Sequence, residues 1–355
     1  MSFQIGIVGL PNVGKSTLFK ALTKKQVDVA NYPFCTIDPN VGVVAVPDTR
    51  LEKLALISHS QEIIPTTIEF VDIAGLVKNA HKGEGLGNQF LAHIREVDAI
   101  IEVVRDFADK NIIHVEGTVD PERDRDIISL ELVMADLETA NKKMASLHKE
   151  VKSGNKEIQK NMLLFEGLKA HLEQGNLARE FMCSVDDKKV IKELNLLTTK
   201  PLIFVLNVDE NCQSAVLEQK FGSQVIKINA KLEAELADLP AADVADYLKE
   251  LNISSTGLDK LIIESYRILN LITFLTSGPK ETRAWTVCRG TKAPEAAGVI
   301  HTDFIKGFIR AEICAWQDFV TYGGEVGVKE KGLMRLEGKD YVIQDGDTIY
   351  FRVST

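Results

Sequence analysis

Long apolar segments are absent from this 355-residue chain. A transmembrane helix needs about 20 predominantly apolar residues in succession, and no such run occurs, so the sequence predicts no membrane span and no membrane partner. The first residues form an apolar segment with no basic region in front of it, which argues against a secretory signal peptide. We therefore expect a cytoplasmic protein.

Cysteines are few, and their spacing offers neither a zinc site nor a disulfide framework. The chain has five, an odd number, and no two of them stand in a C-x-x-C motif. Scattered cysteines in a cytoplasmic protein are reduced thiols by default. The five positions are Cys35, Cys183, Cys212, Cys288 and Cys314.

An excess of basic residues is also missing, although the charge is unevenly distributed. The formal net charge is −9, which argues against a general nucleic-acid binder. Residues 142–160 nevertheless hold six lysines and two glutamates, a local charge of +4, while residues 278–355 are neutral and the remainder carries −13. A basic segment on an acidic body favours a local contact with RNA or another polyanion. The alternative is that these lysines only solvate an exposed tip.

What the chain does have is a phosphate-binding loop. Residues 9–16 read GLPNVGKS, which matches the spacing G-x-x-x-x-G-K-[ST], between an apolar strand-like segment at 3–8 and a predicted helix that begins at Ser16. The glycines allow the backbone to fold around an anion, with successive N–H groups and the helix N-terminus directed at it. In this interpretation Lys15 binds the β- and γ-phosphates, and the Ser16 hydroxyl ligates Mg²⁺.

Alternating apolar and helical segments predict an α/β fold, with a mostly parallel, doubly wound sheet covered on both faces. The alternation covers residues 1–120 and resumes near residue 201. A long helical segment therefore interrupts the nucleotide-binding domain. The strands expected in the sheet are 3–8, 42–46, 67–71, 99–104, 201–207 and 225–229.

The interruption carries its own helical pattern. Apolar residues recur at alternating spacings of three and four, which is an a/d heptad seam, and a second stripe follows the turn-forming residues 152–155. We expect an antiparallel helical hairpin whose tip carries the lysine cluster. The first stripe is Leu130, Val133, Leu137, Ala140, Met144, Leu147 and Val151, and the second is Ile158, Met162, Phe165, Leu168 and Leu172, closed by Gly175.

Short strand-like segments dominate the C-terminal part of the chain. A helical stretch is expected at 257–275, and residues 276–279 read as a linker. Beyond it we expect a small, mostly β domain with a tight turn at Asp345-Gly346. Its strand-like segments are 284–288, 298–301, 310–313, 341–343 and 348–353.

Three motifs at the ends of predicted strands indicate a switch NTPase rather than another kind of P-loop protein. Asp72 follows the strand 67–71 and opens the motif DIAG, so its carboxylate can hold Mg²⁺ through water while the Gly75 amide senses the γ-phosphate. Thr36, in the loop NYPFCT, offers a hydroxyl to Mg²⁺. The motif NVDE at 207–210 stands where switch GTPases carry N-K-x-D.

The last of these motifs bears on the choice of base. Guanine offers N1–H and an amine, which the Asp of N-K-x-D accepts together, whereas this chain has Glu210 in that place and Val208 in place of the lysine. If Glu210 turns aside, the Asn207 amide can accept from adenine N6 and donate to N7. We therefore favour adenine. The alternative is that Glu210 still reads guanine from a shifted backbone.

A water-positioning glutamine is missing as well. Ras-type switches carry it directly after their DxxG motif, where this chain has Leu76, a residue without a donor or acceptor. Another group must orient the attacking water, or hydrolysis is slow. The downstream candidates, among which the sequence does not choose, are His81, His93 and Arg95.

These motifs together resemble the YchF subfamily of Obg-like ATPases, and the resemblance covers nearly the whole chain. The matching stretches are GLPNVGKST, YPFCT, DIAGL and NVDE, with IHTDF, GFIRAEI and QDGD further on. The resemblance implies an Obg-type G domain at 1–277 with a helical, coiled-coil insertion at 122–200, followed at 278–355 by a ubiquitin-like β-grasp domain called TGS. It also implies ATP rather than GTP as substrate, Mg²⁺ dependence and association with ribosomes.

The functional residues are carried over from the same motifs. Relatives with asparagine at the position of Asn12 often use a potassium ion, which makes K⁺ a second candidate cofactor beside Mg²⁺. The expected metal ligands are Ser16 and Thr36; the expected catalytic residues are Lys15, Asp72 and Gly75; and the expected nucleotide-binding residues are Asn12, Val13, Gly14, Lys15, Ser16, Thr17, Asn207 and Glu210.

We interpret the sequence as a Mg²⁺-dependent ATPase that works as a conformational switch. Its expected partners are ATP and the ribosome or ribosomal RNA, contacted through the hairpin tip and the TGS domain. One alternative is an Obg-type translational GTPase, which nucleotide preference would distinguish. The other is a nucleotide-gated ribosome- or RNA-binding module with incidental hydrolysis, which turnover would distinguish.

Overall fold

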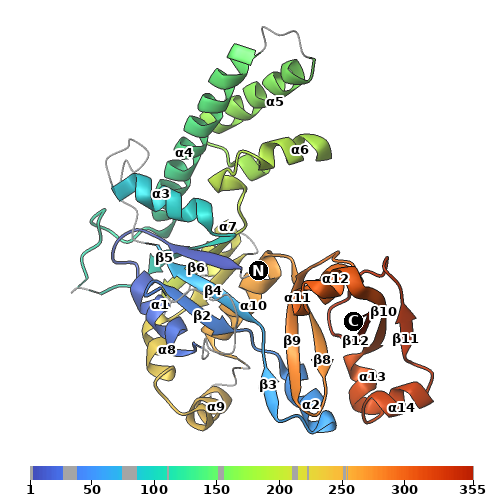
Figure 1. Ribbon diagram of the computed structural model, residues 1–355. Coiled ribbons are helices and arrows are strands. Elements are labelled where there is room, and N and C mark those ends of the chain that lie inside the picture. The colour runs from blue at the N-terminus through green and yellow to red at the C-terminus, as the bar shows by residue number, and fades with distance from the viewer. Residues whose placement is uncertain are drawn as a thin grey trace. The chain divides into compact units, whose positions relative to one another are not determined.

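The computed structural model divides the chain into two compact units (Figure 1). One unit contains residues 1–42 and 69–258, and the other contains residues 43–68 and 259–355. No helix in the part of the chain that the structure describes is long and apolar enough to cross a bilayer. The described residues are 3–26, 38–73, 86–109, 112–150, 156–209, 215–221, 224–250, 253 and 255–354.

A six-stranded sheet in the order β2-β4-β1-β5-β6-β7 carries the nucleotide-binding fold. From β4 to β7 each neighbouring pair is parallel. The inner strands are apolar and buried along almost their whole length, as parallel strands with helices on both faces must be, and the predicted α/β class is confirmed. The strands, each within two residues of its predicted bounds, are β1 (Gln4–Val8), β2 (Val41–Ala45), β4 (Thr67–Asp72), β5 (Ala99–Asp106), β6 (Leu202–Val208) and β7 (Val225–Ile228).

Helices connect these strands. The first, α1 (Lys15–Lys24), begins inside the phosphate-binding loop and packs against α8 (Ala230–Leu236). Leu18 and Leu22, one turn apart on α1, are completely buried, which gives this helix a single apolar face. The other helices are α3 (Leu86–Glu96), α7 (Ala215–Phe221), α9 (Ala241–Glu250) and α10 (Gly257–Ile268).

Between β5 and β6 the chain forms the predicted helical hairpin of α4 (Pro121–Glu150) and α5 (Lys156–Glu173) (Figure 1). The two predicted apolar stripes meet in one core. The buried residues that the stripes contribute are Val133, Ala140, Leu147, Phe165, Leu168 and Leu172, and Ala178, Ile191 and Leu196 from the segment after α5 complete the core.

The predicted seam is wrong at its first position, because Leu130 is 55% exposed. With 30 residues, α4 is about 45 Å long, whereas the 18 residues of α5 span about 27 Å. Leu130 therefore lies beyond the reach of α5. Val151 and the turn residues 152–155 lie outside the described residues.

A buried carboxylate on α4 anchors the return of the chain from the hairpin. Asp136 accepts hydrogen bonds from the Leu197 and Thr198 amides (2.7 and 2.8 Å) and from the Thr198 hydroxyl (2.7 Å). Burial raises the pKa of Asp136, and these hydrogen bonds oppose the shift. The return segment contains helix α6 (Val185–Lys192) and the 3-10 helices η4 (Ala178–Glu180) and η5 (Leu197–Thr199).

The second unit is built on a mixed sheet in the order β11-β10-β12-β8-β9-β3. An antiparallel hairpin joins β8 and β9, while β12 runs parallel to β8 and antiparallel to β10. This is the mixed sheet expected of the predicted β-grasp domain. Its strands are β3 (Glu62–Ile64), β8 (Leu271–Ser277), β9 (Glu281–Cys288), β10 (Phe308–Ala315), β11 (Arg335–Glu337) and β12 (Asp347–Val353).

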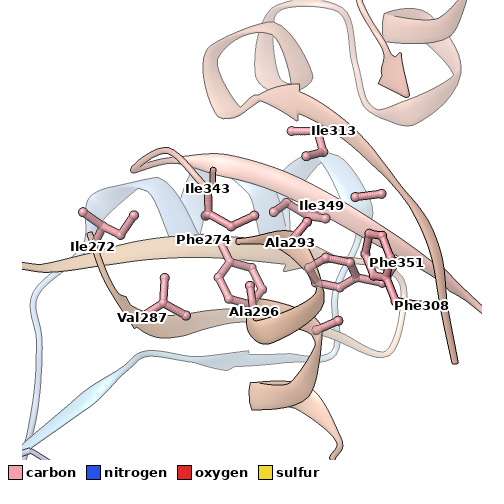
Figure 2. Packing of buried hydrophobic residues seen from close by; sticks show 12 residues of the cluster. Ile272, Phe274, Val287, Ala293, Ala296, Phe308, Ile313, Ile343, Ile349 and Phe351 are labelled. Atoms are coloured by element: carbon pink, nitrogen blue, oxygen red, sulfur yellow. The ribbon is translucent and has the colours of Figure 1, made fainter. Parts of the chain in front are cut away.

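One apolar core lies on a single face of this sheet, together with helix α11 (Ala293–Ile300) (Figure 2). The Phe274 ring stacks on Trp285, with centroids 6.3 Å apart, and meets Phe351 edge-on at 5.8 Å. The core members are Ile272, Phe274, Val287, Ala293, Ala296, Ala297, Phe308, Ala311, Ile313, Ile343, Ile349 and Phe351.

Residues from the first sixth of the chain complete this unit. Leu51 and Leu54 of helix α2 (Thr49–Ser58) are buried in a second cluster with Leu275 of β8. On the same helix, the Arg50 guanidinium donates to the carboxylate of Asp345 at 2.8 Å. The remaining helices are α12 (Asp303–Gly307), α13 (Trp316–Thr321) and α14 (Glu325–Glu330).

The helix predicted over 257–275 is wrong at its C-terminal end. Helix α10 stops at Ile268, Asn270 adopts a left-handed φ of 55°, and residues 271–275 belong to β8. Ile272 and Phe274 face one core while Leu275 faces the other, so a strand buried on both faces shows none of the alternation that would have identified it.

The linker predicted at 276–279 is the end of that strand and the turn of a hairpin. The Gly278 amide donates to the Glu281 carbonyl at 3.1 Å, which closes the turn between β8 and β9. The domain boundary predicted after residue 277 therefore falls inside a hydrogen-bonded hairpin and differs from the division into compact units. As a statement about independently folding domains it stays a prediction.

Two of the predicted C-terminal strands are also wrong. Residues 298–300 are the last residues of helix α11. This helix begins with Ala293-Pro294, and proline is well placed in the first turn of a helix. Residues 341–343 contribute only an isolated bridge between Val342 and Lys292. The turn predicted at Asp345-Gly346 is confirmed, since the Asp347 amide donates to the Gln344 carbonyl and Gly346 has φ 85°.

Candidate nucleotide-binding site

A cavity of about 720 Å³ lies where the carboxyl ends of β1, β5, β6 and β7 meet. Ligands of open α/β sheets bind at this edge, because the loops that follow parallel strands converge there. Four segments line the cavity, one after each strand. They contribute Asn12, Gly14, Lys15, Ser16 and Thr17; Phe107, Ala108, Asp109 and Ile112; Asn207, Val208 and Asp209; and Asn229, Ala230 and Lys231.

The phosphate-binding loop has the backbone that its sequence predicts. Gly14 has φ 100° and caps α1, and Asn12 also adopts a left-handed φ of 62°. A Cβ atom at Gly14 would overlap the Asn207 side-chain amide, so this glycine is required both for its dihedral and for the close approach. Ser16 and Thr17, in the first turn of α1, are exposed to the cavity.

Lys15 and Asp72 carry opposite charges at the phosphate end of the site. Lys15 is 8% exposed, and its ammonium donates to the Leu10 carbonyl at 2.8 Å. Burial lowers the pKa of Lys15, and the Asp72 carboxylate opposes this shift. Burial likewise raises the pKa of Asp72, which ends β4, and Lys15 opposes that shift. Each side chain therefore stabilises the charged form of the other, which offsets part of the cost of removing both groups from water.

Asn207 makes two hydrogen bonds within the protein. Its Nδ2 donates to the Val13 carbonyl at 2.9 Å, and its Oδ1 accepts from the Ala230 amide at 3.1 Å. The side chain is 6% exposed. One amide therefore joins the phosphate-binding loop to the segment after β7. The direct pairing of this amide with adenine stays a prediction.

Several predicted residues lie outside the described part of the chain. They are Thr36 and its loop 31–36, Gly75, Leu76, His81 and Glu210.

The other two candidates for orienting water lie on α3. His93 is exposed, with its Nδ1 3.8 Å from the Glu96 carboxylate. Arg95 donates to the Thr139 hydroxyl at 3.0 Å and to the Asn195 carbonyl at 3.3 Å. Arg95 therefore attaches α3 to the helical insertion.

The sequence motifs did not reveal the cavity wall formed by residues 107–109 and 112, or the arginine that holds it. Arg105, the next-to-last residue of β5, is 2% exposed. A basic residue near the carboxyl end of a mostly apolar strand, between the strand of the P-loop and the strand before NVDE, is the signal that would have found it.

A buried histidine–aspartate pair, also missed, follows the same wall. His114 Nε2 lies 2.7 Å from Asp124 Oδ2, and Nδ1 of the same ring accepts from the Glu116 amide at 3.1 Å. With Nδ1 accepting, Nε2 carries the proton and donates to Asp124, and this sets the tautomer. Asp124 lies in the first turn of α4, so the pair connects the cavity wall to the base of the hairpin.

Comparisons with known proteins agree with this geometry. Residues 4–165 match the model of a family described as 50S ribosome-binding GTPase, and residues 271–354 match that of the YchF GTPase C-terminal family, described as a protein of unknown function. Two curated relatives, each named ribosome-binding ATPase YchF, come from Haemophilus ducreyi and Bacillus subtilis. Each is 49% identical, over 99% of this chain and 99% of its own.

A solved structure titled as the Schizosaccharomyces pombe YchF GTPase has the same fold. It is 39% identical to this chain, with a TM-score of 0.88 over 99% of this chain and 98% of its own. These relatives differ in the base for which they are named, since some are called ATPases and others GTPases.

Proposed function

The chain belongs to the YchF family, and from that premise we propose that it is a Mg²⁺-dependent ATPase that acts as a nucleotide-controlled conformational switch on the ribosome. The resemblance predicted from its motifs is confirmed at the level of the family. The cavity is the observation that carries the proposal. Its volume falls in the range of about 300–1,000 Å³ typical of small-molecule sites, with phosphate-binding groups at one end and Val208, Asp209 and Lys231 at the other.

The residues at the phosphate end fit a Mg²⁺ ion bound together with the triphosphate. Mg²⁺ keeps several waters and takes few protein ligands at nucleotide sites. The described residues hold no group of three or more His, Cys, Asp or Glu side chains placed for a metal, and such a site does not need one. Ser16 would ligate the ion directly, with Thr36 as the second proposed hydroxyl, and Asp72 would act through water. The ion supplies neutralising charge to the phosphates. Asn12 is the residue on which K⁺ is proposed as a second cofactor.

The protein's own groups position the triphosphate. Lys15, already partly dehydrated, is placed to exchange its bond to the Leu10 carbonyl for phosphate oxygens. The backbone amides of residues 13–17 would point at the same oxygens, with the N-terminus of α1 behind them. Gly75 would report the γ-phosphate to the second switch. Binding of phosphate and release after hydrolysis would then move the switch segments.

Selection of adenine would act at the far end of the cavity. Because the Asn207 amide is bound to Val13 and Ala230, we propose that it acts by fixing the wall, while Glu210, Val208 and their backbone disfavour guanine. We expect ATP to bind at least ~10-fold more tightly than GTP, a difference of ~1.4 kcal/mol. Calorimetric titration of both nucleotides with Mg²⁺ tests this. Equal or tighter GTP binding would favour the alternative, an Obg-type translational GTPase.

The helical hairpin and the C-terminal β domain are the proposed contacts with the ribosome or its RNA. The lysine-rich segment 142–160 belongs to this hairpin in the sequence, and Lys142 is strongly exposed and paired with Glu138 at 2.7 Å. A ribosomal partner implies a cytoplasmic protein. Measured turnover separates this proposal from a nucleotide-gated binding module, because such a module would respond to ATP even when hydrolysis is blocked.

A further inference from the structure

Arg105 makes an unusual set of contacts for a residue in a buried strand. Its Nε donates to the Phe107 carbonyl at 3.1 Å, its Nη1 to the Ile112 carbonyl at 3.1 Å, and its Nη2 to the Asp109 carbonyl at 3.3 Å. The guanidinium carbon also lies 4.4 Å from the centre of the Phe107 ring. Every nitrogen of the planar fork is thus used on one short loop, and a cation–π contact completes the arrangement.

The loop that Arg105 holds is a wall of the nucleotide cavity. Phe107, Asp109 and Ile112, whose carbonyls it binds, all line the cavity. In the sheet, β5 lies between β1 and β6, so the loop after β5 lies between the phosphate-binding loop and the segment 207–209. A nucleotide with its phosphates at the phosphate-binding loop and its base at residues 207–209 would pass along this wall where the nucleoside joins the phosphates.

A second contact ties the same wall to the phosphate-binding loop. Asn12 Nδ2 donates to the Ile113 carbonyl at 3.1 Å. Arg105 thus holds the wall itself, and Asn12 holds the residue that follows it. Its position is therefore coupled to the loop that binds phosphate, and from Ile113 the chain passes directly to His114 and its bond with Asp124 at the base of α4.

Burial of a guanidinium is costly unless its donors are satisfied. A buried aliphatic side chain would fill the space beneath the wall without that cost, but it would leave three carbonyls unheld. The contacts of Arg105 thus have a geometric consequence, which is that the carbonyls of Phe107, Asp109 and Ile112 are held in place. Burial of apolar surface alone would not produce it.

We propose that Arg105 is a positioning residue for nucleotide binding, which fixes the cavity wall formed by residues 107–109 and 112 against the nucleoside. The inference rests on the proposed function, because it assumes that the cavity takes a nucleotide. Arg105 does not itself touch the nucleotide. It sets the place of the groups that do, and losing it lowers affinity without removing a ligand contact.

Calorimetric titration of ATP into the full chain provides the test, because it measures the dissociation constant and the number of sites separately. Arg105→Met keeps an unbranched apolar stem but removes all donors, and we expect its dissociation constant for ATP to rise at least ~10-fold with the stoichiometry unchanged. Arg105→Lys keeps the charge but lacks the planar fork, so it should lie between wild type and Arg105→Met.

Leu168→Ala is the matched control, since it removes a buried side chain of the hairpin core far along the chain from the site. It should lower thermal stability yet bind ATP with the wild-type constant. A purely structural role for Arg105 would lower the number of sites and leave the dissociation constant unchanged, and that result in either Arg105 variant overturns the inference. Absence of ATP binding by the wild-type chain would instead overturn the proposed function.

Discussion

Asn207 connects three separate segments of the chain through one side-chain amide. It joins the end of β6 to Val13 in the phosphate-binding loop and to Ala230 at the start of α8. Its position in the NVDE motif suggests contact with a base, and its bonds indicate a brace. A motif identifies where a residue acts, whereas the role depends on which partners its polar atoms already have.

Replacing Asn207 with alanine leaves a buried carbonyl and a buried amide without partners. We expect the free energy of unfolding to fall by about 1–3 kcal/mol and the ATP dissociation constant to rise, because the Val13 carbonyl belongs to the phosphate-binding loop. Urea unfolding and calorimetric titration measure the two effects. Asn207→Asp is the control, since it keeps an acceptor for Ala230 but places an oxygen opposite the Val13 carbonyl. Wild-type behaviour of both variants would contradict the brace.

Because of Glu312 on β10, we expect the free energy of unfolding of the second unit to depend on pH. Hydrogen bonds from Arg352 (2.9 and 3.2 Å) and Arg310 (3.2 Å) lower its pKa to about 2, against the opposing effect of burial. Because this value lies below the ordinary 4.5, the contribution is present above pH 4.5 and disappears as the pH falls toward 2.

Thermal unfolding of wild type and Glu312→Gln measures this contribution. The variant should be less stable than wild type at pH 7, and the difference should shrink at pH 3 and below. Glu330→Gln, at an exposed position of α14, serves as the control and should match wild type at both pH values. A difference between Glu312→Gln and wild type that stays constant with pH would refute the assignment.

The α4–α5 hairpin is the element whose form was most predictable from the sequence. Its heptad spacing is local, and the apolar stripes of the two helices meet as expected. The spacing could not show how far along α4 the two helices stay in contact, since Leu130 continues the apolar pattern of α4 beyond the end of α5. The pattern of one helix does not contain the length of its partner.

The tip of this hairpin is the proposed RNA contact. Replacing Lys149, Lys152 and Lys156 with glutamate should weaken co-sedimentation with ribosomes and reduce its dependence on salt, because each lost phosphate contact lowers the salt slope by about one. The same number of reversals on α6, at Lys188, Lys189 and Lys192, is the matched control in the same insertion and should have little effect. Equal co-sedimentation of both triple variants would mean that the tip lysines only solvate the surface.

At the scale of the whole molecule, the chain passes between its two compact units three times. It leaves the nucleotide-binding unit after residue 42, returns at residue 69 and leaves again after residue 258. Helix α2 and strand β3 therefore belong to the unit that contains the C-terminal β domain. A division of this protein at a single point in the chain separates parts that pack together.

Truncation after residue 277 tests this organisation. It would remove β9 to β12 and leave Leu51, Leu54 and Leu275 without most of their apolar neighbours. We expect residues 1–277 to aggregate or to bind a hydrophobic dye, whereas the full chain should do neither. A monomeric fragment that unfolds as cooperatively as the full chain would support the boundary predicted from the sequence.

Hydrolysis is expected to depend on the complete assembly. Because Leu76 cannot orient water, the isolated protein should turn over slowly, near the ~10⁻⁴ s⁻¹ of incomplete switch sites, and K⁺ or ribosomes should accelerate it by up to ~10⁵-fold. Lys15→Ala and Ser16→Ala should abolish activity, while Leu76→Ala should leave the residual rate largely intact. Single-turnover cleavage of ATP in Na⁺, in K⁺ and with ribosomes measures this. Fast cleavage in Na⁺ alone would show that another residue already positions the water.

The sequence alone determined the features that depend on neighbours along the chain. The glycine spacing of the phosphate-binding loop, the strands of the parallel sheet and the two apolar stripes of the hairpin could each be read locally. So could the place of Lys15 and Ser16 at the start of α1. In these segments the backbone conformation follows from short-range sterics and periodicity, and tertiary packing does not change it.

Tertiary structure decided the features that depend on residues far apart in the sequence. Residues 271–275 form a strand because two cores cover both of its faces, and α2 joins the C-terminal sheet through Leu275 and Asp345. Arg105 and Asn207 acquired their roles from carbonyls and amides that the fold brought beside them. The free energy of burying a polar group depends on the partners it finds there, and a one-dimensional pattern does not contain those partners.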